Sequence, residues 1–246
     1  MDMTGNTILI TGGGSGIGRA LAEALHARGN KVIVSGRRAS ALEEVAAANP
    51  GIATATLDVS DPADIARFAA EIVAAHPALD FVIHNAGIMQ AEALTAPGSD
   101  LAVAEATIAT NLLGPIRLNA ALLPHLLARP KAVIATVSSG LAFVPLTATP
   151  TYSATKAAIH SWSQSLRHQL KDTAVKVIEI APPAVATDLM PGHAENPNSM
   201  PLADYIAETM AQLDAGADEN LTERVKFLRF AEARGDYAKV FGALNG

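Results

Sequence analysis

The sequence predicts an α/β fold: a doubly wound parallel sheet of six or seven strands, with helices on both of its faces. Short apolar, β-branched runs alternate along the chain with longer segments in which apolar residues recur at helical spacing. Such alternation is typical of βαβ units joined by right-handed crossovers. No linker, repeat or low-complexity block divides the 246 residues. A single domain over residues 1–246 is therefore expected.

The first half of the chain contains four expected strands. They cover residues 6–11, 31–35, 52–57 and 80–84. Helices are expected from Ile17 to just before Gly29, through Leu42 and Val45, and from Pro62 through Val73. Residues 91–99 are expected to form a loop.

The second half continues the alternation of helices and strands, and an irregular segment and a helical tail are expected after it. Two helical segments are expected at roughly 100–111 and 115–128, a strand at 132–137, a long helix at about 151–171 and a strand at 175–180. The stretch from Asp188 to about Met200 is rich in Pro, Asn and Gly, which suggests a substrate flap somewhere in residues 188–215. From Leu202 the chain is expected to be helical to its end, apart from Gly216 and Gly235.

Bulk composition narrows the classes of partner. Half of the residues are apolar and 17% are charged, which is enough for a sizeable core. The net charge of −6 argues against nucleic acid or an anionic membrane as the main partner. The chain has no cysteine, which excludes thiolate metal sites and thiol nucleophiles, and no metal site is predicted. With no apolar stretch that spans a bilayer and no leader-like segment, a soluble cytoplasmic protein is expected.

Glycines 12, 16 and 18 stand directly between the first expected strand and the first expected helix. At such a junction glycine permits a tight turn and a close approach of the backbone to a pyrophosphate, which the positive end of the helix attracts. This context predicts a Rossmann-type dinucleotide site. A P-loop would need Lys and then Ser or Thr after Gly18, and a nucleophile elbow would need glycine at Ile17. A purely structural turn remains the alternative.

The second expected strand ends in Arg37 and Arg38, with no acid beside them. A NAD site usually places a carboxylate here for the ribose 2′-hydroxyl, whereas the 2′-phosphate of NADP calls for arginine. NADP(H) is therefore the preferred cofactor, with NAD(H) as the alternative. Asp58, at the end of the third strand, is expected to meet the adenine. A helix-capping role, which Asp61 would equally fill, is the alternative for Asp58.

The stretch from Ser139 to Lys156 joins the end of a strand to a helix. Ser139 follows the apolar run at 132–137, and Tyr152 and Lys156 are four residues apart, so they share one face of a helix. A hydroxyl, a phenol and an ammonium group are expected to converge in the crevice of the sheet. A Tyr-x-x-x-Lys pair alone is more often a solvated helix face. The pair therefore indicates a catalytic site only together with other motifs.

These motifs together resemble the short-chain dehydrogenase/reductase family over nearly the whole chain. The segment Thr11-Gly12-x-x-x-Gly16-x-Gly18 is similar to the family's cofactor loop, and Asn85-Ala86-Gly87 to its strand-stabilising segment. The family's catalytic tetrad falls on Asn111, Ser139, Tyr152 and Lys156. The resemblance implies a cofactor bound by Gly12, Gly14, Ser15, Gly16, Ile17, Gly18, Arg37, Arg38, Asp58, Val59, Asn85, Ala86, Gly87, Tyr152, Lys156, Pro182, Val185 and Thr187.

The resemblance also implies a mechanism. Tyr152 would exchange a proton with the substrate oxygen while hydride passes to or from the nicotinamide. A free tyrosine has a pKa of about 10, and the Lys156 ammonium is expected to lower the pKa of Tyr152. Lys156 would also hold the nicotinamide ribose, Ser139 would orient the substrate oxygen, and Asn111 would hold a water that links Lys156 to solvent. Ser138 is a competing hydroxyl, but the family spacing favours Ser139.

Three features depart from the family pattern. Pro183 replaces the glycine of the Pro-Gly-x-x-x-Thr segment and restrains the backbone beside the nicotinamide. His84 stands where the family often has Asn, and a structural role is expected for it. Many members end with a strand rich in Val and Gly, whereas residues 222–230 here are expected to form an amphipathic helix. Since one interface of the common tetramer uses that strand, a homodimer is expected, with a homotetramer as the alternative.

The leading hypothesis is an NADP(H)-dependent oxidoreductase that interconverts a secondary alcohol and a ketone or aldehyde. Its partner would be a small-molecule carbonyl or alcohol substrate. The alternative is a cofactor-binding sensor or scaffold on the same fold, without turnover. Apolar residues at 141–146 and in or beside the flap suggest an apolar substrate face, although core packing explains them equally well.

Overall fold

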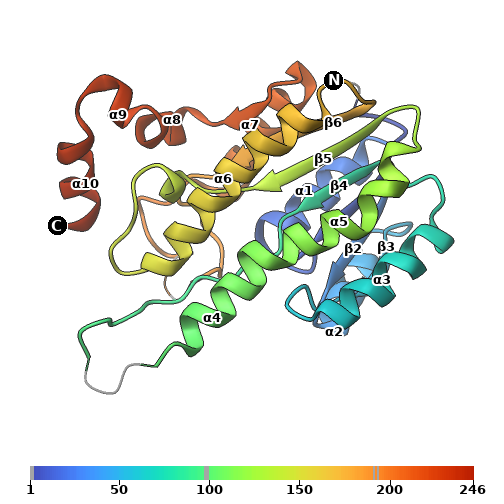
Figure 1. The fold of residues 1–246 in the computed structure, drawn as a ribbon, viewed down its shortest axis with the longest axis horizontal. Helices are drawn as coiled ribbons and strands as arrows, with labels where there is room; N and C mark the ends of the chain where they lie inside the picture. The colour runs from blue at the N-terminus through green and yellow to red at the C-terminus, as the bar shows by residue number, and fades with distance from the viewer. Residues whose placement is uncertain (1–2, 97–99, 191, 193) are drawn as a thin grey trace.

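Seven strands form one parallel sheet in the order β3-β2-β1-β4-β5-β6-β7 (Figure 1). The structure is a computed structural model that describes residues 3–96, 100–190, 192 and 194–246. The strands are β1 (Thr7–Thr11), β2 (Lys31–Gly36), β3 (Ala53–Thr56), β4 (Phe81–His84), β5 (Ala132–Val137), β6 (Val175–Ala181) and β7 (Glu219–Leu221). The helices are α1 (Gly16–Ala27), α2 (Ala39–Ala48), α3 (Pro62–Ala75), α4 (Ala102–Ile108), α5 (Gly114–Leu127), α6 (Pro150–Leu170), α7 (Leu202–Ala215), α8 (Glu223–Arg229), α9 (Ala231–Arg234) and α10 (Tyr237–Asn245).

Helices cover both faces of the sheet, which confirms the predicted fold class. Side chains alternate along each strand, so Ile8 and Ile10 enter one apolar layer and Leu9 enters the other. The first layer packs α1, α2 and α7 against the sheet, with Tyr205 fully buried in it. The second layer packs α3, α5 and α6 against the opposite face, around Phe68. A parallel sheet buried on both faces explains why the strands are almost uniformly apolar.

The strand order reverses between β1 and β4. From β1 the chain builds outward through β2 and β3, and it then returns to add β4 on the other side of β1. A crevice forms outside the carboxyl ends of the strands at such a reversal. The glycine loop after β1, Arg37 after β2 and Asn85 after β4 all follow strands that meet there.

Helices α4 and α5 are continuous, so the break expected between residues 111 and 115 is wrong. A π-helical segment, Ala109–Leu113, joins them. Pro115 has no N–H to donate within the helix, and the wider π turn immediately before it accommodates that loss. Asn111 lies in this turn and is buried.

The expectation that the chain is helical from Leu202 to its end is also wrong, because the tail contains a seventh strand. Residues Glu219–Leu221 pair in parallel with β6. The side-chain amide of Gln212 accepts a hydrogen bond from the Leu221 backbone N–H at 2.6 Å and donates one to the Leu221 carbonyl at 2.5 Å. A side chain from α7 thereby stabilises a strand too short to be recognised from its composition. The helix expected after it is present as α8.

The segment expected to be a flap divides into two parts. The described residues of 188–199 lie mostly in turns and bends, and α7 (Leu202–Ala215) occupies most of the remaining range. The backbone of Met200 exchanges hydrogen bonds with Ala184 and Ala186 at 2.8 and 2.9 Å, which closes the base of the irregular part. Residues 191 and 193 of this segment, and residues 97–99 of the loop expected at 91–99, lie outside the described residues. A helix long and apolar enough to cross a membrane is not found in the described part of the chain.

Candidate active site

The glycine loop packs directly on the end of β4. Asn85 follows β4, and its side-chain amide donates hydrogen bonds to the carbonyl oxygens of Thr11 and Gly12 at 2.9 and 3.3 Å. The Thr11 hydroxyl accepts hydrogen bonds from the backbone N–H groups of Asn85 and Ala86, each at 3.0 Å. A Cβ on Gly12 would lie 2.9 Å from the Ala86 Cα. Glycine is therefore needed for the loop to reach this position.

A cavity of about 180 Å³ opens along the carboxyl ends of β1, β2 and β4. It is lined by half of the predicted cofactor-binding residues: Gly12, Gly14, Ser15, Arg37, Arg38, Asp58, Val59, Ala86 and Gly87. Ile88, Leu57 and Thr110 also line it and were not predicted, since no motif marks them. The cavity lies at the strand-order reversal, where the fold places ligands.

Charged side chains surround the outer part of the cavity. Arg37 and Arg38 are exposed at the end of β2, and the Arg38 guanidinium donates to the Ser15 hydroxyl at 3.4 Å. The Asp58 carboxylate accepts hydrogen bonds from the backbone N–H and the hydroxyl of Ser60, at 2.9 and 2.6 Å. Asp61, rather than Asp58, caps α3. The two arginines thus face the cavity, whereas the Asp58 carboxylate is bound by Ser60, two residues further along the chain.

The remaining predicted cofactor residues lie around this cavity without lining it. Thr187 is beside the glycine loop, since a Cβ on Gly16 would lie 3.6 Å from the Thr187 Cβ. Val185 is buried and pairs with Met200, and Ile17 packs against the core. The Pro182 carbonyl accepts a hydrogen bond from the Gly140 N–H at 2.8 Å.

Ser139, Tyr152 and Lys156 are buried close together near the ends of β5 and β6. Tyr152 and Lys156 stand one turn apart on α6 and are 6% and 5% exposed. The Lys156 ammonium donates to the Val137 carbonyl at 2.7 Å and lies 5.5 Å from the centre of the Tyr152 ring. Ser139 is adjacent to the Tyr152 phenol, whereas the Ser138 hydroxyl turns to the Ile180 carbonyl. The expected convergence of these side chains is therefore present.

Gly87 connects this group to the cavity. It lines the cavity, and a Cβ on it would lie 3.7 Å from the Lys156 ammonium and 3.3 Å from the Asn111 side-chain oxygen. Asn111 reaches this point from the π turn and exchanges two hydrogen bonds with the backbone of Ile88, at 2.8 and 2.9 Å. All four residues of the predicted tetrad are therefore near one another, although they come from the π-helical segment, the end of β5 and α6.

The electrostatics of Tyr152 differ from the expectation. Burial raises the pKa of Tyr152 to about 12, opposed by the Ser139 hydroxyl. Burial also lowers the pKa of Lys156 to about 8, opposed by the Glu179 carboxylate. The prediction that Lys156 lowers the pKa of Tyr152 is thus wrong for the chain alone, since the ammonium is directed at the Val137 carbonyl and desolvation of the phenol dominates.

The loop between Ser139 and Tyr152 is fixed by the C-terminal tail. A Cβ on Gly140 would lie 2.7 Å from the Leu228 Cδ1 of α8. Val144 is fully buried against Ala231 and Val240, so core packing explains this residue of the expected apolar substrate face. The Asn245 side chain accepts a hydrogen bond from the Thr147 N–H at 2.6 Å and donates to the Pro145 carbonyl at 3.1 Å. Sequence reading missed these contacts because they join segments about a hundred residues apart.

His84, one of the departures from the family pattern, is buried at the end of β4. It is 4% exposed, and burial lowers its pKa to about 4 in spite of the neighbouring Asn119 amide. A neutral, buried imidazole agrees with the structural role expected for it. Glu92 is a further residue that sequence reading missed: its carboxylate accepts hydrogen bonds from the backbone and hydroxyl of Thr151, at 2.9 and 2.7 Å, at the start of α6.

Known proteins are similar to this chain in sequence and in fold. The uncharacterized oxidoreductase DltE of Bacillus subtilis (strain 168) is 40% identical over 249 residues, covering 100% of this chain and 98% of that protein. A short chain dehydrogenase from Burkholderia cenocepacia, solved in complex with NADP, is similar at a TM-score of 0.85 and 25% identity, covering 99% of each chain. A short chain dehydrogenase/reductase from Burkholderia phymatum, solved with NAD, shares the fold at a TM-score of 0.82 and 20% identity, covering 98% of this chain and 96% of that one.

The family model for short chain dehydrogenases matches residues 6–198. That span contains the glycine loop, the Asn-Ala-Gly segment and the whole of the buried Ser139–Lys156 group. The chain therefore belongs to the short-chain dehydrogenase family.

Proposed function

We propose that the protein is an NADP(H)-dependent oxidoreductase that interconverts a secondary alcohol and a ketone or aldehyde, with Tyr152 as the acid/base. The observation that carries the proposal is the position of Gly87. It borders both the cavity beside the glycine loop and the Lys156 ammonium. A dinucleotide in the cavity would thus have one end beside the buried hydroxyl, phenol and ammonium groups.

The residues around the cavity fit a nicotinamide dinucleotide. The α1 helix begins at Gly16, and the Ser15 side chain makes no capping hydrogen bond to it. The first backbone N–H groups of α1 therefore remain available to a pyrophosphate, which the positive end of the helix favours. Gly14 and Ser15 line the cavity at this point. When bound, the cofactor would supply or accept the hydride at its nicotinamide.

The preference for NADP(H) is supported by Arg37 and Arg38. Both arginines line the cavity, whereas its acid, Asp58, is engaged by Ser60. A guanidinium can bind a 2′-phosphate through charge-assisted hydrogen bonds. A relative with NADP bound and another with NAD bound have the same fold, which supports a nicotinamide cofactor in general.

Four residues of the chain would then hold the substrate oxygen and move the proton. The Tyr152 phenol, with its pKa raised to about 12, is protonated at neutral pH and would donate this proton to a carbonyl oxygen in the reduction direction. Ser139, next to the phenol, would hydrogen-bond the same oxygen and hold it in place. Lys156 would return a proton to Tyr152 and hold the ribose. Asn111, close to Lys156 across Gly87, would bind the water that connects this lysine to solvent.

Activity should be tested by following nicotinamide absorbance while purified protein and NADPH meet a panel of ketones and aldehydes. Tyr152→Phe should lower kcat by about 100-fold or more, the usual contribution of a general acid, and change the Kd for NADPH far less. Tyr237→Phe removes the hydroxyl of an exposed tyrosine on α10 and should leave kcat unchanged. Full activity of Tyr152→Phe would exclude Tyr152 as the acid. Tight NADPH binding without turnover across the whole panel would favour the sensor or scaffold function instead.

A further inference from the structure

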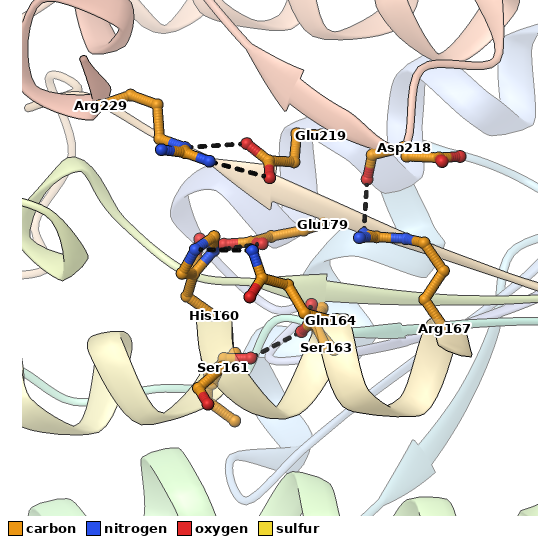
Figure 2. A network of polar contacts seen from close by, with 12 residues as sticks. His160, Ser161, Ser163, Gln164, Arg167, Glu179, Asp218, Glu219 and Arg229 are labelled. Atoms are coloured by element: carbon orange, nitrogen blue, oxygen red, sulfur yellow. Dashed lines mark hydrogen bonds and ion pairs between the residues drawn. The ribbon is translucent and has the colours of Figure 1, made fainter. Parts of the chain in front are cut away.

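The helix that carries Tyr152 and Lys156 continues with polar side chains on the same face. His160 follows Lys156 by one turn, and Gln164 follows His160 by another. Figure 2 shows His160 rising from α6 against the Glu179 carboxylate of β6, where its Nδ1 lies 2.7 Å from Oε2. The Gln164 amide nitrogen lies 3.2 Å from the other ring nitrogen, Nε2. A chain of three polar side chains therefore begins at the surface and ends at a buried carboxylate.

The two contacts of His160 hold its ring in place. The Glu179 carboxylate only accepts hydrogen bonds, so the His160 Nδ1 donates to it. The Gln164 side-chain amide lies against Nε2 on the other side of the ring. His160 therefore orients the Glu179 carboxylate.

Glu179 is an unusual residue for the middle of a sheet. It is 1% exposed on β6, and its second oxygen, Oε1, is buried without a hydrogen-bond partner among the described residues. A buried carboxylate that is only partly satisfied is destabilising for the fold. Packing alone would favour an apolar residue here, as at its neighbours Ile178 and Ile180, so the charge requires another explanation.

A metal ion does not supply that explanation. His160, Glu179 and Glu219 do offer ligand atoms within 4.8 Å of one another. However, the Arg229 guanidinium of α8 already binds both oxygens of Glu219, at 2.9 and 3.2 Å (Figure 2). Both ring nitrogens of His160 are engaged as well. The groups that would have to bind a cation are thus occupied by the chain itself.

The Glu179 charge lies near Lys156, whose ammonium binds the neighbouring strand β5. Glu179 is in register with Thr136 on β5, and the next residue, Val137, accepts the hydrogen bond of the Lys156 ammonium at 2.7 Å. The Thr136 hydroxyl contacts Ser163 of α6, which places this face of β5 and β6 under the helix. Lys156 and Glu179 are therefore opposite charges buried on the same face of the sheet. Their attraction is strong where water is excluded.

We propose that Glu179, oriented by His160, is a positioning residue that keeps Lys156 protonated and thereby sets the alkaline limit of the reaction. The inference rests on the proposed function only in its consequence for turnover, because the charge state of Lys156 can be measured in a protein that catalyses nothing. Tyr152 and Lys156 remain the residues that would touch substrate and cofactor.

Burial and Glu179 act on Lys156 in opposite directions. Burial lowers its pKa to about 8, and the Glu179 carboxylate limits this decrease. Without that carboxylate the pKa of Lys156 would fall further, and the lysine would be largely neutral at a physiological pH. The charged and titratable groups that face Glu179 and Lys156 from the surrounding elements are Tyr152, His160 and Arg167 of α6, Glu219 of β7 and Arg229 of α8.

The test is a direct titration of Lys156 by NMR in protein carrying ¹³C at the lysine ε-carbons, with the signal assigned by its loss in Lys156→Met. Glu179→Gln should lower the midpoint of this titration by about one pH unit, the size expected for the loss of one nearby opposite charge. Glu219→Gln removes a carboxylate of the same network that Arg229 already neutralises, so the midpoint should stay at the wild-type value. An unchanged midpoint in Glu179→Gln, or an equal decrease in Glu219→Gln, would overturn the proposal.

Substitutions of His160 provide a second measurement if Glu179→Gln does not fold. His160→Gln retains a hydrogen-bond donor to Glu179 and should keep the wild-type midpoint, whereas His160→Leu leaves the carboxylate without this donor and should lower the midpoint of Lys156. Equal midpoints in these two variants would contradict the orienting role of His160. In an active enzyme, the alkaline limb of the kcat/KM profile should move with the NMR midpoint. A midpoint that moves without any turnover in wild type would refute the proposed function and leave the role of Glu179 standing.

Discussion

Gly18 lies so close to Asn85 that a Cβ on the glycine would come within 2.4 Å of the Asn85 amide nitrogen. The same Cβ would lie 2.4 Å from the Gly12 carbonyl oxygen. That amide nitrogen joins the end of β4 to the end of β1. The first turn of α1, the glycine loop and the two central strands thus form one close-packed unit at the edge of the cavity.

Gly18→Ala should therefore destabilise the protein by about 1–3 kcal/mol, as for other overpacked sites, because backbone atoms must shift to admit the methyl group. Urea unfolding would measure the change. Gly242→Ala is the matched control: this glycine lies in α10 with nothing within 4 Å of its Cβ position, and the substitution should stabilise by up to about 1 kcal/mol. Equal effects of the two substitutions would contradict the close packing at Gly18.

Arg37→Asp should reverse the proposed cofactor preference. The substitution removes a cation from the end of β2 and places a carboxylate where it would repel a 2′-phosphate and accept a bond from a ribose hydroxyl. The Kd for NADPH should rise by about tenfold or more, corresponding to the loss of one charged hydrogen bond, while the Kd for NADH should not rise. Fluorescence titration with both cofactors would measure this.

Arg28→Asp makes the same change of net charge at the far end of α1, where Arg28 pairs with Asp214. It should affect the two cofactors equally. If Arg28→Asp discriminated between NADPH and NADH as strongly as Arg37→Asp, the effect would be one of overall charge and not of the site.

His84 should make the fold sensitive to acid. In the unfolded chain this imidazole binds a proton near pH 6.5, whereas in the folded chain it does so only near pH 4. The unfolded state therefore binds more protons between these values, and the free energy of unfolding decreases as the pH falls from 6.5 to 4. The contribution of this one group is about 3 kcal/mol.

His84→Asn should remove that contribution, and the amide is comparable in size and polarity. Urea unfolding at pH 7 and at pH 4 would show a smaller loss of stability on acidification in the variant than in wild type. An identical loss in both proteins would mean that the imidazole has the same pKa in the folded and unfolded chains.

The sequence predicted those parts of the site that depend on local spacing. Tyr152 and Lys156 could be placed on one face because a helix fixes the relation between residues four apart. Gly12 and Gly18 could be placed at a strand–helix junction because they stand directly between an apolar run and a segment with helical spacing. The fold class followed from the alternation of apolar runs, which the two core layers on the sheet explain.

Features that depend on contacts between distant segments could not be predicted. The π turn at Asn111 results from Pro115 together with packing against Ile88, and no local pattern distinguishes it from a helix end. The seventh strand exists because β6 offers an edge and Gln212 binds Leu221. The raised pKa of Tyr152 reflects burial, which only the assembled fold determines.

The C-terminal tail contacts the loop after Ser139, but it lies outside the part of the chain that contains the predicted catalytic residues. The residues that would carry out the chemistry all precede residue 188, within the span that the family model matches. Leu228 and Asn245 lie beyond that span, yet they contact the loop that follows Ser139. If the protein has the proposed function, changes in the last twenty-five or so residues would alter which substrates it accepts and leave its reaction type unchanged.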